Sequence, residues 1–449
     1  MSVPVRARRN AAPAHRFLPI AAFAATFLAA PPSHAQQSDV AALREEMRQM
    51  RAEYARQIEA LRQAYEARMG DLEKRLAAPP AAAAARPSPA TASSASAFNP
   101  AIGVILNGTA ASLSQDPGGY MIRGFALGEE TAPGERGLSL GETEVNFSAN
   151  IDHVLYGSLT VALTPENEAE VEEAFIQTTS LPEGFTLKGG RFFSGIGYLN
   201  EKHAHNWDFV DQPLPYRAML ANQYRDDGAQ LRWLAPLDLF FEVGGELMRG
   251  DGFPAAGAHD GIGAWTAFGR VGGDIGASHS WRLGASYLDA DADGRATNDG
   301  ADVFRGTSKL VIVDAVYKWA PDGNPTERNL AIAGELFLGE VDGEFNGTNF
   351  GQQQRGWYAQ AVYQFMPRWR VGVRYDEVWA RGAAGVLAGT ALDDAGLTLY
   401  RMTGMIDFST SEFGRFRFQY NNDRSNTDAD HQFYLQYTVS LGAHGAHGY

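Results

Sequence analysis

A period-two alternation of apolar and polar residues is the feature that most constrains how this chain of 449 residues can fold. In the segment 431–441, odd positions from Phe433 to Leu441 are apolar or aromatic, whereas even positions from Gln432 to Ser440 carry Gln, Tyr, Thr and Ser. Successive side chains of a β-strand point to opposite faces, so such a segment predicts a strand with one apolar and one polar face. No apolar run is long enough for a membrane-spanning helix.

About sixteen such segments follow one another from residue 100 onward. The connections after odd-numbered segments are mostly long and polar, and those after even-numbered segments are mostly short, although 164–169 and 320–329 depart from this rule. Outer-membrane barrels have short periplasmic turns and longer external loops, which a soluble β-sandwich does not require. The sequence therefore predicts an all-β fold, a transmembrane antiparallel β-barrel of about 16 strands over 100–449, wide enough for a water-filled lumen. The predicted strands lie near 101–113, 138–151, 153–163, 170–180, 184–196, 226–234, 239–250, 262–275, 279–289, 308–319, 330–340, 353–366, 369–380, 397–408, 413–421 and 431–441.

The first 99 residues predict three segments that precede the barrel. Residues 1–35 combine a basic start, an apolar stretch and the small residues Ser33 and Ala35, as in a secretory signal peptide. Residues 36–76 predict an α-helical coiled coil, a periplasmic stalk whose seam favours a parallel homo-oligomer, with a trimer as one candidate number. An isolated amphipathic helix is the alternative. Residues 77–99 form an Ala/Pro/Ser linker.

Composition excludes several functions. The formal charge of −15 argues against nucleic acid as a partner. The absence of cysteine excludes disulfides and thiol chemistry. The sequence has no Gly-x-Ser-x-Gly, His-Glu-x-x-His or phosphate-binding glycine loop, so it predicts no enzyme. Asp289, Asp291 and Asp293 lack the terminal glutamate of a calcium loop and predict an acidic external loop. The aromatic C-terminus, Tyr449, is the kind of residue that barrel-assembly machinery reads.

The succession of signal peptide, stalk, linker and barrel resembles the phosphate-selective porin family of bacterial outer membranes. The segment from Gly190 to Asn200, the segment from His203 to Asp211 and the end of the chain are more similar to a poorly characterised outer-membrane family of proteobacteria. Some members of that family are labelled zinc-regulated or TonB-dependent receptors. A TonB-dependent transporter needs a plugged, 22-stranded barrel, and no plug fits between the linker and the first strand. The resemblance therefore implies a porin-like channel.

The long connection 197–225 is the third external loop by strand count, and loops of this length are often functional. It is rich in aromatic residues and holds Pro213 and Pro215, so we expect it to pack against the barrel wall and narrow the lumen. Imidazole and carboxylate groups suit zinc and similar ions, although hydrogen-bonded anchoring of the loop explains the same residues. The candidate metal ligands are His203, His205, Asp208 and Asp211; His444 and His447 form a second candidate pair.

Several arginines fall on the predicted inner face of the barrel. Arginine rings favour anions in a pore, whereas pairing with inward acids such as Glu144, Asp376 and Asp407 would give them a structural role. The candidate pore-lining residues are Arg232, Arg370, Arg374, Arg401, Arg415 and Arg417.

The sequence thus predicts an outer-membrane channel that lets small hydrophilic solutes or ions pass without chemistry. The alternatives are a zinc-linked binding or uptake protein and a structural barrel tied to the cell wall by its stalk. Apart from a possible divalent metal such as zinc, no cofactor is expected, and the expected partners are outer-membrane lipid, copies of the same chain and the assembly machinery.

Overall fold

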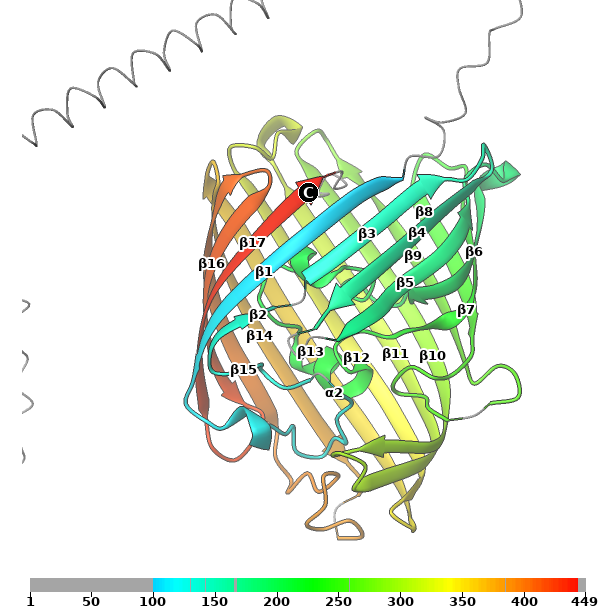
Figure 1. Cartoon of the computed structure of the whole chain (residues 1–449), viewed down its shortest axis with the longest axis vertical. Helices are drawn as coiled ribbons and strands as arrows, with labels where there is room; N and C mark the ends of the chain where they lie inside the picture. Colours follow the sequence, from blue (N-terminus) through cyan, green and yellow to red (C-terminus); the bar gives the residue numbers. More distant parts are fainter. Residues whose placement is uncertain are drawn as a thin grey trace, which may run out of the picture. The chain divides into compact units, whose positions relative to one another are not determined.

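The computed structural model describes residues 100–129, 131–141, 143–164, 168–257, 259–383 and 385–442. The predicted signal peptide, stalk and linker lie outside these residues, as do Tyr449, His444 and His447. The described residues form one antiparallel sheet that closes on itself, because β1 pairs with β17 (Figure 1). Its strands are β1 (Ala101–Leu113), β2 (Gly137–Leu140), β3 (Thr143–Asn150), β4 (Leu155–Leu163), β5 (Ala169–Thr178), β6 (Phe185–Phe193), β7 (Arg225–Leu234), β8 (Phe240–Met248), β9 (Ala264–Ile275), β10 (His279–Thr297), β11 (Asp302–Trp319), β12 (Asn329–Phe345), β13 (Thr348–Met366), β14 (Trp369–Arg381), β15 (Leu399–Ser411), β16 (Gly414–Arg424) and β17 (Asp430–Gly442).

Two of the seventeen strand segments share one place in the barrel. Residues 108–111 of β1 pair with β2, and residues 101–105 of β1 pair with β3. The predicted strand 138–151 is therefore interrupted after Leu140 and continues along the same neighbour. Counted around its circumference, the barrel has sixteen strands, and the predicted fold class is confirmed for the barrel.

The two faces of the wall differ as the alternation predicts. In β17, Gln432 and Gln436 are buried on the inside, whereas Phe433 and Leu435 are about half exposed on the outside. A polar inner face and an apolar outer face are the pattern of a barrel that meets lipid with its outer surface. Among the described residues, no helix is long and apolar enough to cross a membrane.

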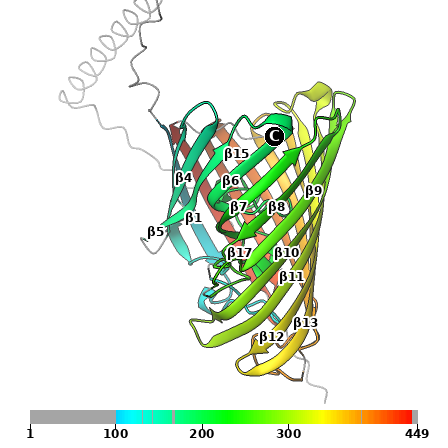
Figure 2. The same ribbon diagram turned by 90° about the vertical axis from the view of Figure 1, so that its right-hand side faces the viewer.

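The wall is uneven in height, and here one prediction from the sequence was wrong. The region 290–307, expected to be an acidic loop, is mostly strand: β10 has 19 residues and β11 has 18, and they pair as far as Thr297 and Asp302. Asp289, Asp291 and Asp293 lie on β10. Their polarity suggested a loop, but a hairpin that extends into water also alternates polar side chains while its backbone groups stay paired. By contrast, β3–β6 have 8 to 10 residues (Figure 2).

Two connections fold into the barrel and form a hydrophobic core with its wall. The connection between β1 and β2 contributes Ile122 and Phe125, which are fully or almost fully buried. The connection between β6 and β7, residues 194–224, is called the internal loop below. Its helix α2 (Leu214–Leu220) lies within the barrel with all seven residues buried (Figure 1). Pro215 lies in the first turn of α2, where a proline is tolerated, and the helix ends at Ala221 in a left-handed conformation.

Candidate functional site

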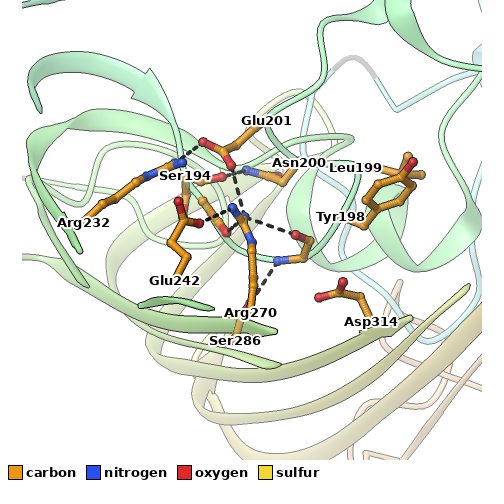
Figure 3. Close-up of polar contacts among 12 residues, drawn as sticks. Ser194, Tyr198, Leu199, Asn200, Glu201, Arg232, Glu242, Arg270, Ser286 and Asp314 are labelled. Atoms are coloured by element: carbon orange, nitrogen blue, oxygen red, sulfur yellow. Dashed lines mark hydrogen bonds and ion pairs between the residues drawn. The ribbon is translucent and has the colours of Figure 1, made fainter. Parts of the chain in front are cut away.

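The internal loop is fastened to the wall from its first residues. Ser194 donates its hydroxyl to Glu246 of β8, and the Gly195 amide donates to the same carboxylate at 2.8 Å. Arg270 of β9 donates to the carbonyl of Gly195, and the Gly197 amide donates to Ser286 of β10 at 3.0 Å (Figure 3). The start of the loop is therefore held by three successive strands.

Glu201 is the next anchor and lies between two arginines of the wall. Its carboxylate pairs with Arg232 of β7 and with Arg270 at 3.1 Å, while Arg270 also pairs with Glu242 of β8 at 2.9 Å (Figure 3). Burial alone would raise the pKa of Glu201, but the two arginines outweigh it and lower the pKa to about 2. Glu201 thus stays charged and paired across the physiological pH range.

A buried carboxylate two strands further along the wall, on β12, holds two more parts of the loop. Glu335 of β12 accepts hydrogen bonds from the Tyr216 hydroxyl at 2.9 Å and from the Tyr198 amide at 2.9 Å. It also accepts one from the Tyr358 hydroxyl at 2.7 Å. Gly197 has φ +66°, and a Cβ atom there would lie 2.5 Å from both the Glu335 carboxylate and the Tyr216 hydroxyl. This position therefore requires glycine for its backbone conformation and for space.

Asp208 and Asp211, proposed from the sequence as metal ligands, contact arginines instead. Asp208 pairs with Arg370 at 3.0 Å. Asp211 pairs with Arg374 at 2.7 Å and with Arg401 at 2.9 Å. Burial opposes the charge on Asp211, but Arg401 and Arg374 outweigh it and hold its pKa well below the usual range. Because arginines bind these two carboxylates, Asp208 and Asp211 do not join His203 and His205 in one metal site.

All six arginines proposed to line the pore contact the internal loop. Beyond the pairs above, Arg415 donates to the His205 carbonyl at 2.8 Å and Arg417 donates to the Trp207 carbonyl at 2.6 Å. The sequence offered pairing with inward acids as an alternative role for these arginines. Asp376 and Asp407 of the wall do pair with them, whereas Glu144 does not. These contacts favour an anchoring role for the six residues Arg232, Arg370, Arg374, Arg401, Arg415 and Arg417.

Glu144 contacts histidines instead. His203 and His205 stack with ring centroids 5.7 Å apart, and a short 3-10 turn at Ala204–Asn206 places both rings together. His205 Nδ1 lies 2.7 Å from Glu144, and the two ring nitrogens of His203 lie 3.1 Å and 2.9 Å from Glu172 and Glu173 of β5. Burial opposes protonation of His203, but hydrogen bonds to the three carboxylates outweigh it and raise its pKa well above the usual value.

The glutamates of β5 were missed from the sequence for an identifiable reason. Strict alternation places Glu172 and Glu173 on opposite faces of a strand. In the structure Thr160 pairs with Glu173 and Val161 with Val171, so Glu172 is the extra residue of a β-bulge. The bulge turns both carboxylates toward His203. The acidic run around these residues was the available signal, but a bulge is set by pairing with the neighbouring strand.

Comparison with solved structures places the barrel in a class. OmpT with its loop L8 deleted, an outer membrane protein of Vibrio cholerae, matches at a TM-score of 0.52 and 10% identity, over 76% of this chain and 99% of that chain. In-vitro folded OmpT in its trimer form matches at 0.51 and 9% identity, with the same shares. The anion-selective porin from Comamonas acidovorans matches at a TM-score of 0.49 and 11% identity, again over 76% of this chain and 99% of that chain.

The fold is therefore that of bacterial outer-membrane β-barrels such as OmpT. An uncharacterized protein of Aquifex aeolicus (strain VF5) is 28% identical over 343 residues, which are 70% of this chain and 70% of that protein. No family model matches the chain.

Proposed function

We propose that this protein is a passive channel of the outer membrane for small hydrophilic solutes, in which the internal loop sets the width and charge of the path. One observation carries the proposal: a closed sixteen-stranded barrel with a polar inner face has its longest connection folded inward and fixed to the wall. Sixteen strands enclose a space that their own side chains do not fill. A loop held inside that space becomes its constriction.

The mechanism requires no chemical step. Polar side chains on the inner wall replace part of the hydration of a passing solute, and charges at the constriction favour or oppose it. The Lys202 ammonium lies 3.5 Å from the centre of the Tyr198 ring, and the Arg282 guanidinium lies 4.8 Å from the same ring. Asp208 lies near Lys202 and lowers the local positive charge. This mixture of charges suits hydrophilic solutes of either sign, and the phosphate-selective resemblance supports trials with phosphate.

The proposal is tested by inserting the refolded full chain into planar lipid bilayers. We expect discrete conductance steps and a reversal potential under a KCl gradient that reports the ion preference. Heat-modifiable migration in gels identifies the folded barrel independently. A folded barrel that inserts and does not conduct would overturn the channel and favour a structural barrel tied to the cell wall by the stalk predicted at 36–76.

We also propose that the protein is a homo-oligomer. A solved OmpT structure with the same fold is described as a trimer form, and the coiled coil predicted from the sequence would favour association of copies. Mass measurement of the detergent-solubilised protein tests this point separately from conductance.

A further inference from the structure

Five metal-ligating side chains come together where the internal loop meets β3 and β5. One ligand atom from each of Glu144, Glu172 and His203 lies within 4.8 Å of the other two. His203 Nδ1 is 3.1 Å from Glu172 Oε2 and 3.4 Å from Glu144 Oε2. Glu173 and His205 adjoin this group through His203 and Glu144 respectively. Three separate segments of the chain thus supply one cluster.

These distances match the spacing between neighbouring ligands of a bound transition metal. Zinc binds nitrogen and carboxylate oxygen at about 2.0–2.2 Å with tetrahedral geometry, which places neighbouring ligand atoms about 3.4 Å apart. The separations of 3.1 and 3.4 Å from His203 Nδ1 are close to that value. Two of the three ligand separations are therefore already close to those of a zinc site.

The charge of the cluster also favours a cation. Glu144 and Glu172 are each 3% exposed, and burial of several carboxylates is costly unless they are paired. In the part of the chain that the structure describes, the ion-pair partners of Glu144, Glu172 and Glu173 are histidines, with no lysine or arginine within pairing distance. This contrasts with Asp208 and Asp211 on the same loop, which arginines neutralise.

We propose that Glu144, Glu172 and His203 form a site for a divalent transition metal such as zinc, with Glu173 and His205 as adjoining donors. Imidazole with carboxylate suits zinc and similar ions, whereas magnesium and calcium prefer oxygen ligands alone. Three protein ligands leave a fourth position open. The His203 side chain is 19% exposed, and its ring forms a T-shaped contact with that of Phe193, with centroids 5.4 Å apart. The site is independent of whether the barrel conducts.

A bound ion would tie the internal loop to the part of the wall that the short strands β3–β6 form. The arginine anchors come from β7, β9 and β14–β16, whereas Glu144 and Glu172 lie on β3 and β5. Metal binding would thus complete the attachment of the loop around the barrel.

The test is calorimetric titration of the refolded full chain with Zn²⁺ at pH 7.5, with Mg²⁺ as the comparison ion. We expect one Zn²⁺ per chain and no Mg²⁺ binding at the same concentrations. Glu172→Gln and His203→Ala should each weaken Zn²⁺ binding at least tenfold. Glu168→Gln, the same change at an exposed residue directly before β5, should leave it unchanged.

Three results would overturn the site. The first is that the parent does not bind Zn²⁺, in which case His203 is a protonated partner of the three carboxylates. The second is that the Glu172→Gln variant folds and binds Zn²⁺ as tightly as the parent. The third is that replacement of His444 and His447 by alanine abolishes Zn²⁺ binding, which would place the ion at the end of the chain. Heat-modifiable migration checks the fold of each variant. The intensity of the visible bands of the Co²⁺-loaded protein reports whether the ion is four-coordinate, as the proposed site requires.

Discussion

Asp211 and Arg401 form a buried ion pair of 2.9 Å although they are 190 residues apart in the sequence. The arginine lies on β15 and the aspartate on the internal loop, so the pair joins the loop to the wall. Arg401 also pairs with Asp376 of β14 at 2.7 Å. Removing one partner from such a network leaves a charge without compensation, which is the costly case for buried pairs.

Asp211→Asn should therefore loosen the loop. The loss of its charge leaves Arg374 and Arg401 under-compensated, at a cost of about 3–5 kcal/mol. We expect larger and noisier single-channel conductance and a lower thermal transition. Asp428→Asn, at an exposed position, is the matched control. Conductance equal to that of the parent would show that the ion pair does not hold the constriction.

The same pair predicts how the channel responds to acid. The pKa of Asp211 is lowered in the folded protein, so its stabilising effect is fully present above the unfolded value of about 3.9. The effect is lost only as pH falls through the lower folded pKa. Conductance should stay constant from pH 7 to about pH 4 and rise under stronger acid. An increase in conductance between pH 7 and pH 5 that is absent from Asp211→Asn would contradict this assignment.

Gly197→Ala should destabilise the loop through both backbone and packing. A left-handed conformation costs a residue with a Cβ about 1–2 kcal/mol, and here the Cβ also meets Glu335 and Tyr216. Gly347→Ala is the matched control, because Gly347 has φ +79° with nothing within 4 Å. Thermal unfolding should show a larger loss for Gly197→Ala, and equal losses would remove the packing argument.

Charge reversal at Lys202 should change the ion preference of the channel. Lys202 lies on the internal loop near Asp208 and Arg282. Lys202→Glu should shift the reversal potential under a KCl gradient toward cations. Arg328→Glu, the same change of charge in the exposed turn between β11 and β12, should have a smaller effect. Equal shifts would mean that the loop does not control selectivity.

The strands were predictable because their signal is local. Alternation along 369–380 or 431–441 depends only on which face each side chain takes, and the paired strands begin and end within a few residues of the predicted bounds. The length of the β10–β11 hairpin was not predictable in this way, since polar residues suit both a loop and a strand that extends into water. The inward direction of the six arginines also follows from alternation, but their partners do not.

The sequence by itself determined the barrel, the number of its strands and the polar character of its inner face, because a period of two is imposed residue by residue. Only the tertiary structure decided what the internal loop contacts. Closure of the sheet brings β3 and β5 to one end of the loop's 3-10 turn and β14–β16 to the residues that follow it. Asp208 and Asp211 therefore meet arginines, while His203 meets Glu144 and Glu172. Ion pairs between such distant segments depend on the register of the whole barrel, which no short stretch of sequence encodes.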